Sequence, residues 1–293
     1  MDERFSLLTV HAHPDDEASK GPGTIAKYHA AGVRTVLVSC TGGEEGEILN
    51  PAMDTPEVRA DIGAVREREL AAAADAIGYD EVELLGYRDS GMAGSEANAN
   101  PDCFAAAPLE EAVGKLVEII RRVRPQVIIG YGEDHSGYPH PDHIRAHEIA
   151  VAAFEAAGDP GRFAEAGDAF QPLKLYYTVW SRRRILETHE KFLELGLESP
   201  FDEGWFKRAE ERADQEDEIT TSIELTGYED VRRDALLAHA TQIDPTSKFW
   251  FGLPLHEARK IYPFDDYVLT RSLVDSDPPE TDLFAGIWAS VSS

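Results

Sequence analysis

Apolar positions follow two alternating patterns over residues 1–160 of this 293-residue chain. Short apolar runs of the kind found in buried strands occur at residues 5–10, 33–39, 81–85 and 127–129. Between these runs, segments with helical spacing or composition predict helices at 20–31, 58–77 and 109–123. Strands that alternate with helices in this way predict a parallel sheet with helices on its faces.

The rest of the chain is less regular. Strand-like runs occur at residues 173–180 and 219–225, and a helix is expected at 231–239. We find no internal repeat, low-complexity tract or clear linker. The predicted fold is therefore α/β, a single domain over residues 1–293. It has a Rossmann-like, mostly parallel sheet flanked by helices in a catalytic core at 1–160, and C-terminal α/β elaborations at 161–293 that shape the substrate pocket.

Polar clusters follow the predicted strands, at the point where each strand ends. The segments 13–17, 41–44, 88–91 and 137–143 all occupy such positions. In open α/β sheets, ligands bind outside the carboxyl ends of the strands. These four clusters are therefore expected to meet at one edge of the sheet and to form a site there.

The first and last of these clusters contain the ligand set of a metal ion. His13 and Asp16 lie three residues apart, and His143 follows Pro141, a residue suited to the first turn of a helix. Two histidines and one carboxylate are typical of a catalytic zinc with an open position, although iron(II) accepts the same set. Asp15, adjacent to a ligand, is the candidate general base for a metal-activated water.

Residues around the second histidine cluster suit the remaining steps of amide hydrolysis. His140, paired with Asp142, is the candidate to stabilise the oxyanion and to protonate the leaving amine, and Tyr138 is a candidate donor to the oxyanion. His147, four residues after His143, remains an alternative ligand. His11 is expected to be a structural histidine. The predicted reaction class is metal-assisted hydrolysis of an amide.

The composition of the chain limits the classes of partner and indicates the cellular compartment. The formal net charge of −27 argues against nucleic acid or an anionic membrane as a partner, and the acid-rich stretch 187–218 is expected to be helical and solvated. No apolar run approaches the roughly 18 residues that span a bilayer, and we expect no signal peptide. Cys40 and Cys103 are too few for a disulfide framework and favour the cytoplasm. The oligomeric state is left open.

The motifs at residues 12–17, 41–44 and 140–143 together resemble the LmbE-like zinc-dependent N-acetylglucosaminyl deacetylase family. The segment 238–245 is similar to the branch of that family that acts in mycothiol metabolism. The resemblance implies the same metal ligands and general base as above, with His140 and Tyr138 stabilising the transition state. It also implies that Arg66 and Asp89 bind sugar and inositol hydroxyls, with Arg68 as an alternative to Arg66.

Within the mycothiol branch, Lys20 and the loop 43–54 resemble the amidase, whereas residues 132–137 depart from its pattern. The resemblance thus implies a zinc-dependent amidase that cleaves the glucosamine–N-acetylcysteine amide of mycothiol S-conjugates in thiol-based detoxification, with a small-molecule thiol conjugate as substrate. The alternatives are the N-acetylglucosaminyl-inositol deacetylase of mycothiol biosynthesis or a deacetylase of another amino sugar. A nucleotide- or sugar-binding module is the non-enzymatic alternative, but binding alone does not require a carboxylate beside a metal cluster.

Overall fold

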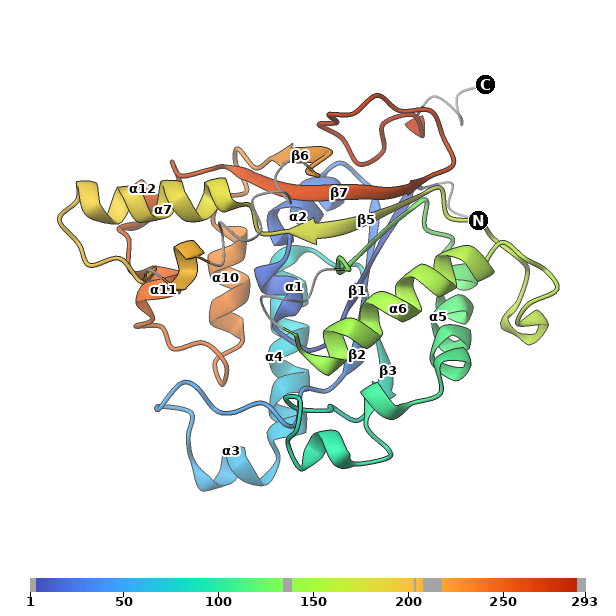
Figure 1. The fold of residues 1–293 in the computed structure, drawn as a ribbon, viewed down its shortest axis with the longest axis horizontal. Coiled ribbons are helices and arrows are strands. Elements are labelled where there is room, and N and C mark those ends of the chain that lie inside the picture. Colours follow the sequence, from blue (N-terminus) through green and yellow to red (C-terminus); the bar gives the residue numbers. More distant parts are fainter. Residues whose placement is uncertain (1–3, 134–138, 203, 208–217, 289–293) are drawn as a thin grey trace.

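A single seven-stranded sheet runs through the computed structural model, which describes residues 4–133, 139–202, 204–207 and 218–288 (Figure 1). The strands are β1 (Ser6–His11), β2 (Arg34–Thr41), β3 (Glu81–Tyr87), β4 (Val127–Gly130), β5 (Lys174–Val179), β6 (Thr221–Glu224) and β7 (Phe264–Ser272). Their spatial order is β3-β2-β1-β4-β5-β7-β6. Strands β1 to β5 pair in parallel, whereas β7 is antiparallel to both β5 and β6.

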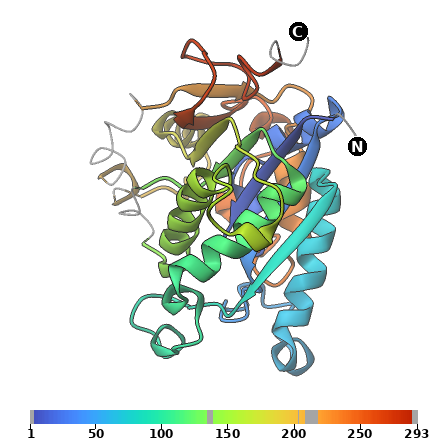
Figure 2. The ribbon, with the colours of Figure 1, turned by 90° about the vertical axis from the view of Figure 1, so that its right-hand side faces the viewer.

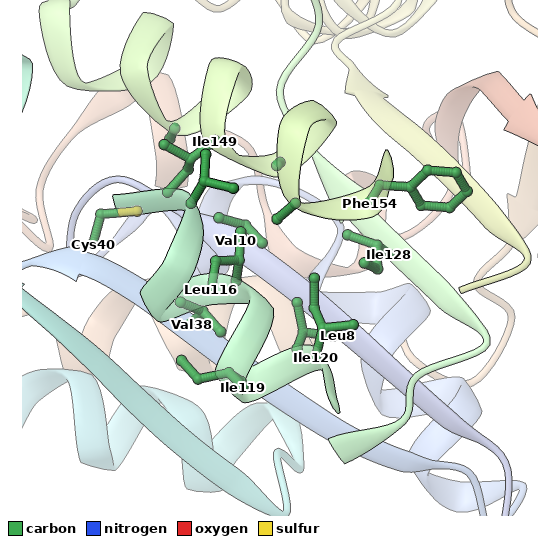
Figure 3. Packing of buried hydrophobic residues seen from close by; sticks show 14 of the residues in the cluster. Leu8, Val10, Val38, Cys40, Leu116, Ile119, Ile120, Ile128, Ile149 and Phe154 are labelled. Carbon is green, nitrogen blue, oxygen red and sulfur yellow. The ribbon is translucent and has the colours of Figure 1, made fainter. Parts of the chain in front are cut away.

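Helices cover both faces of the sheet, as a second view at right angles also shows (Figure 2). The helices are α1 (Asp16–Ser19), α2 (Pro22–Ala30), α3 (Pro56–Ala60), α4 (Ile62–Ile77), α5 (Leu109–Val123), α6 (Pro141–Ala156), α7 (Arg182–Glu194), α10 (Val231–Ala238), α11 (Lys248–Phe251) and α12 (Leu255–Ala258). Short 3-10 helices span Ala97–Ala99, Phe104–Ala106 and Ala164–Ala166. Helices α5 and α6 pack on one face through a core that includes Leu8, Leu116 and Ile149 (Figure 3). Helices α2, α4 and α10 pack on the other face.

The strand order creates a switch point between β1 and β4. From β1 the chain moves outward to β2 and β3, and from β4 it moves in the opposite direction to β5. The connections that follow β1 and β4 therefore separate and leave a crevice at the carboxyl ends of these two strands. Residues 12–17 follow β1 and residues 139–143 precede and begin α6, so both predicted clusters lie at this crevice.

The predicted fold class is confirmed: the sheet is mostly parallel and helices flank it. Strand β7 was not predicted. It lies between β5 and β6, so the C-terminal strands extend the same sheet as the N-terminal ones. None of the described helices combines the length and the apolar character needed to cross a membrane.

Two predicted helices differ from the observed ones. The helix predicted at 20–31 was wrong at its start, since α1 ends at Ser19 and α2 begins at Pro22 after Gly21. Gly21 has a φ of 83°, and a Cβ there would lie 2.4 Å from the hydroxyl of Tyr267. A glycine is therefore required where the chain turns against β7. The helix predicted at 58–77 is divided at Asp61 into α3 and α4.

Candidate active site

The three predicted metal ligands converge at the crevice between β1 and β4. His13 follows β1, Asp16 opens α1, and His143 lies in the first turn of α6. The Oδ2 atom of Asp16 is 3.4 Å from Nδ1 of His13 and 3.4 Å from Nε2 of His143. All three residues are buried. A sharp turn after β1 and a proline at the start of α6 thus bring together residues that lie about 130 positions apart in the chain.

These donors fit a zinc ion. Zinc binds imidazole nitrogen and carboxylate oxygen at about 2.0–2.2 Å in a tetrahedral arrangement, which places neighbouring ligand atoms roughly 3.3 Å apart. The two separations of 3.4 Å in the site match that requirement. One ligand atom from each of the three residues lies within 4.8 Å of the others. A second group of donors, His13, Asp89 and His140, meets the same distance limit, so His13 is common to both groups.

Asp16 is held by several donors at once. Its Oδ2 atom accepts hydrogen bonds from the hydroxyl of Tyr131 at 2.7 Å and from the backbone N–H of His13 at 3.0 Å. The Nζ atom of Lys20 contacts the other carboxylate oxygen. Burial alone would raise the pKa of Asp16, but Lys20 and His143 hold this pKa well below its ordinary value. The carboxylate is therefore charged and available to a cation at neutral pH.

Asp142 supports a predicted metal ligand. Its carboxylate lies 3.2 Å from Nε2 of His13 and accepts a hydrogen bond from the backbone N–H of Ser90 at 2.9 Å. The hydroxyl of Ser90 also donates to this carboxylate. Nδ1 of His140 accepts a hydrogen bond from the backbone N–H of Asp142 at 3.2 Å, which is not the carboxylate–imidazole pair that the sequence predicted. A carboxylate on a ligand histidine fixes the orientation of the ring.

The candidate general base, Asp15, has an unusual backbone. Its φ of 107° lies in a region that residues other than glycine rarely adopt. Its N–H donates to Oε2 of Glu17 at 2.9 Å, and its Oδ2 accepts from Nη2 of Arg66 at 2.9 Å. The side chain is 29% exposed, so it can reach a substrate. Burial raises the pKa of Asp15 and Arg66 opposes this effect, with a net rise.

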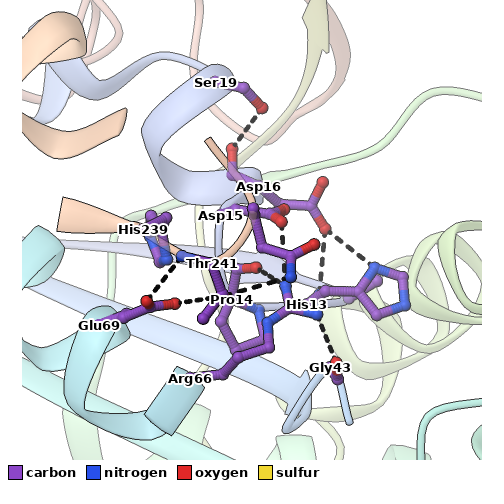
Figure 4. Close-up of polar contacts among 12 residues, drawn as sticks. His13, Pro14, Asp15, Asp16, Ser19, Gly43, Arg66, Glu69, His239 and Thr241 are labelled. Atoms are coloured by element: carbon purple, nitrogen blue, oxygen red, sulfur yellow. Dashed lines mark hydrogen bonds and ion pairs between the residues drawn. The ribbon is translucent and has the colours of Figure 1, made fainter. Parts of the chain in front are cut away.

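Arg66 connects the loops that follow β1 and β2 (Figure 4). Its guanidinium donates to the carbonyl oxygens of Pro14 and Gly43 as well as to Asp15. A Cβ on Gly43, whose φ is 67°, would lie 2.4 Å from this guanidinium, so the loop requires glycine. The Arg66 side chain is only 3% exposed, whereas Arg68 is exposed. Of the two candidate arginines, Arg66 therefore lies at the site.

Asp89 and Lys20, the other predicted substrate-binding residues, lie beside the same cluster. Oδ1 of Asp89 is 3.6 Å from Nε2 of His13 and accepts from the N–H of Gly91 at 2.8 Å. Burial would raise the pKa of Asp89, but His13 lowers it well below its ordinary value. Lys20 contacts Asp16 and keeps 22% of its side chain exposed. Both residues thus combine a contact to a predicted ligand with a position at the crevice.

The remaining predicted residues divide as follows. Both ring nitrogens of His11 are buried without a hydrogen-bond partner, and burial lowers its pKa to about 4, which agrees with a structural histidine. Nδ1 of His147 lies 2.9 Å from the carbonyl oxygen of Tyr131. His147 is not among the metal-binding groups found in the described part of the chain. Tyr138 lies outside the described residues and stays a prediction.

Sequence reasoning missed two contributions from the C-terminal part. His239 contacts Glu17, and both side chains are fully buried. Thr241 donates to Glu69 through its N–H at 2.8 Å and through its hydroxyl at 2.7 Å. Both belong to the segment 238–245, which the motif comparison had singled out without assigning it a role. The sequence signal for such a partner was the run of three carboxylates at residues 15–17, because carboxylates packed this closely need a nearby cation.

Comparison with known proteins agrees with this geometry. The family model of the GlcNAc-PI de-N-acetylases, PIG-L, matches residues 8–154. The chain is 44% identical to a mycothiol S-conjugate amidase of Streptomyces coelicolor, over 98% of this chain and 99% of that relative. It is 41% identical to a 1D-myo-inositol 2-acetamido-2-deoxy-alpha-D-glucopyranoside deacetylase of Streptomyces avermitilis, over 96% of this chain and 97% of that relative.

The fold has counterparts among solved structures. An N,N'-diacetylchitobiose deacetylase from Pyrococcus horikoshii superposes with a TM-score of 0.61 at 15% identity, over 92% of this chain and 85% of that one. At this identity the likeness concerns the fold alone, and it supports the α/β architecture. Taken with the near full-length relatives, the matched family model shows that the chain belongs to the PIG-L (LmbE-like) family and is an amide-hydrolysing enzyme of that family.

Proposed function

We propose that the protein is a zinc-dependent amidase that hydrolyses the amide between glucosamine and N-acetylcysteine in mycothiol S-conjugates. The products would be a mercapturic acid and glucosaminyl-inositol, as in thiol-based detoxification. The observation that carries the choice of substrate is the 44% identity to the Streptomyces coelicolor amidase over nearly the whole of both chains. The free, buried Cys40 and Cys103 agree with a reducing compartment, and we place the enzyme in the cytoplasm.

The residues of the site divide the work of hydrolysis. Zinc held by His13, Asp16 and His143 would act as a Lewis acid and lower the pKa of a bound water to about 7. Asp15 takes a proton from the attacking water as the water oxygen bonds to the amide carbon. That proton reaches the departing nitrogen as the C–N bond breaks, so a carboxylic acid and an amine leave.

Other residues orient and stabilise the reacting groups. Arg66 holds the Asp15 carboxylate through a hydrogen bond of 2.9 Å. We assign His140 to the developing oxyanion or the leaving amine, because its ring lies 4.5 Å from that of His13. Tyr138 keeps the same assignment from the sequence motif alone. Asp89 is assigned to the sugar or inositol hydroxyls, since it is buried at the edge of the metal cluster.

The alternative function is deacetylation of N-acetylglucosaminyl-inositol, and Lys20 favours the amidase. Lys20 resembles the amidase branch in sequence, and it contacts Asp16 with part of its side chain exposed. An ammonium group at this position can meet the carboxylate or amide groups of the larger cysteine conjugate. The acetyl group of the deacetylase substrate offers this ammonium only its carbonyl oxygen.

A direct comparison of the two substrates tests the proposal. We expect zinc-loaded protein to show at least a tenfold higher kcat/KM on a mycothiol S-conjugate, such as the monobromobimane adduct, than on N-acetylglucosaminyl-inositol. The reverse preference would identify the deacetylase and overturn the amidase assignment. Activity on neither substrate would overturn both and point to another acetylated amino sugar.

The metal is tested separately. Elemental analysis of protein purified without added metal is expected to show zinc, with iron as the competing outcome. Dialysis against a chelator should remove activity, and one equivalent of zinc should restore it. His143→Ala should lower the bound metal, whereas His256→Ala, an exposed histidine, should not. Full activity after complete metal removal would contradict the metal-dependent mechanism.

A further inference from the structure

A cavity outside the metal cluster is bordered by α2, α7, α10, α11 and α12. It has a volume of about 340 Å³ and is lined by residues of α10, α11 and α12 and of the segments beside them. Figure 1 shows α10 with α1 and α2 on one side and α11 on the other. None of His13, Asp16 and His143 lines this cavity. The volume lies at the lower end of the range for pockets that bind small molecules, about 300–1,000 Å³.

The walls of this cavity are largely apolar and aromatic. Leu236 of α10 is only 2% exposed, and Trp250, Phe251, Leu253 and Ile261 belong to the same lining. An apolar cavity of this size favours a ligand with an aryl or alkyl body, because burying that body removes its surface from water.

The same cavity carries an excess of positive charge. Arg184 and Arg232 share one carboxylate, since their Nη2 atoms lie 3.3 Å and 2.6 Å from Oδ1 of Asp265. Burial, together with the nearby Arg184, lowers the pKa of Arg232 to about 10, the direction expected for a cation that is not fully compensated.

Arg233 adds a third guanidinium to the lining. It lies 5.4 Å from the ring centre of Phe251. Its charge helps to lower the pKa of Asp230, but among the described residues no carboxylate forms a close ion pair with it. Glu229 is the acidic residue of the lining, and a fourth arginine, Arg259, is neutralised by Asp230. The lining thus holds four arginines and one carboxylate, Glu229. Asp265 and Asp230, which lie outside the lining, pair with three of these arginines, and Arg233 is the fourth.

We infer that this cavity is a binding site for a small amphipathic carboxylate, an organic anion with an apolar or aromatic body. The body fills the space between Leu236 and Phe251, and the carboxylate pairs with Arg233. An arginine fork suits a carboxylate because both oxygens accept parallel hydrogen bonds. In a chain with a net charge of −27, such a local excess of cations is the complement of an anion. This inference is independent of the reaction proposed for the metal site.

The cavity is also connected to the active site by a hydrogen bond. Nη1 of Arg232 donates to the carbonyl oxygen of Ser19 at 2.6 Å, and Ser19 ends the short helix that begins with Asp16. A ligand that interacts with the Arg232 guanidinium would therefore contact a side chain that is hydrogen-bonded to α1, the helix that begins with the predicted metal ligand Asp16.

Titration calorimetry of zinc-loaded protein with 4-phenylbutyrate tests the inference. We expect saturable binding at one site, and at least tenfold weaker binding of the neutral analogue 4-phenyl-1-butanol. Arg233→Gln should weaken binding of 4-phenylbutyrate by at least tenfold. Ala258→Trp, which adds a large side chain to an exposed position of the lining, should do the same without disturbing the core.

Two control variants separate this cavity from other sites. Arg271→Gln removes an exposed arginine that pairs with Glu155 outside the lining and should leave binding unchanged. His143→Ala should also bind 4-phenylbutyrate as the wild type does. Loss of binding in His143→Ala with retention in Ala258→Trp would place the probe at the metal site and overturn the inference. Two further results would overturn the inference: binding of the neutral analogue as tight as that of 4-phenylbutyrate, or no binding of 4-phenylbutyrate at a 10-fold molar excess over protein at millimolar concentration.

Discussion

Glu17 and His239 contact each other across 222 positions of the chain, and both side chains are completely buried. The other carboxylate oxygen of Glu17 accepts the N–H of Asp15 at 2.9 Å. The C-terminal part of the chain therefore supports the backbone of the candidate general base, whose φ of 107° needs such support. Burial would lower the pKa of His239, but Glu17 raises it above its ordinary value, so the contact favours the charged imidazolium.

His239→Gln should weaken both folding and catalysis. Removing one partner of a buried ion pair leaves the other charge uncompensated, which costs about 3–5 kcal/mol. We expect a loss of this order in the free energy of unfolding from urea denaturation, and a fall in kcat greater than the change in KM as Asp15 loses its alignment. His256→Gln, at a position whose side chain is 73% exposed, is the matched control and should resemble the wild type. Unchanged stability and kcat in His239→Gln would refute the supporting role.

Asp15→Asn should remove turnover while leaving the fold intact. A general base typically contributes about 10²–10⁴-fold to the rate, so kcat should fall by at least about a hundredfold. The amide retains the size of the carboxylate and can still accept from Arg66, so the circular dichroism spectrum and zinc content should not change. Asp75→Asn, at an exposed position of α4, serves as control. Turnover within tenfold of the wild type would exclude Asp15 as the base.

Arg66 and Arg68 offer a direct comparison of a buried and an exposed arginine two residues apart. Arg66→Gln removes hydrogen bonds to the carbonyl oxygens of Pro14 and Gly43 and to the Asp15 carboxylate. Hydrogen bonds to a charged group contribute about 1.5–3 kcal/mol each, so kcat/KM should fall by more than about tenfold. Arg68→Gln should keep kcat/KM within about twofold of the wild type. Similar losses in both variants would contradict the assignment of Arg66.

Much of the site could be predicted because its residues lie in short motifs at strand ends. His13 follows β1, Asp16 opens α1 and His143 lies in the first turn of α6, and parallel strands carry such residues to one edge of the sheet. The partners of these residues could not be placed in the same way. The contact of the Asp142 carboxylate with His13 depends on how the loops after β1 and β4 fold together.

Local sequence patterns could not predict the features that arise from contacts between segments far apart in the chain. The break before α2 arises because Gly21 meets Tyr267 of β7, a strand that the periodicity did not predict. His239 and Thr241 reach the site because α10 packs against α1 and α4, a contact between elements more than 150 residues apart. In each case a tertiary contact, rather than local preference, determined the outcome.

Lys20→Met tests the residue that separates the amidase from the deacetylase assignment. Methionine keeps an unbranched apolar stem but removes the ammonium that contacts Asp16. We expect kcat/KM on a mycothiol S-conjugate to fall by about tenfold or more, since a charge-assisted hydrogen bond is lost. The effect on N-acetylglucosaminyl-inositol should be smaller. Lys27→Met, which removes a half-buried lysine bound to the carbonyl oxygen of Glu224, is the control. An equal loss on both substrates would show that Lys20 does not determine the preference.

Glu280→Gln should change how stability depends on pH. Nζ of Lys174 lies 2.6 Å from Oε1 of Glu280, and the two side chains are 0% and 1% exposed. Burial would raise the pKa of Glu280, but hydrogen bonds from Lys174 and Tyr176 lower it below its ordinary value of 4.5. The unfolded chain therefore binds a proton at a higher pH than the folded chain does. The contribution of Glu280 to the free energy of unfolding is fully present above pH 4.5 and is lost as the pH falls through the pKa of the folded state.

The difference in the free energy of unfolding between the wild type and Glu280→Gln should decrease at acidic pH. At pH 7, Glu280→Gln should lower the free energy of unfolding by about 3–5 kcal/mol, because Lys174 is left buried without its counter-charge. Below pH 4.5 the gap to the wild type should narrow. Urea denaturation of both proteins at a series of pH values from 7 to 3 measures it. The pair of Lys248 and Glu198 has the same separation of 2.6 Å but is exposed, so Glu198→Gln should follow the wild type at every pH. A constant gap for Glu280→Gln across the series would mean that the buried carboxylate does not titrate below its unfolded value.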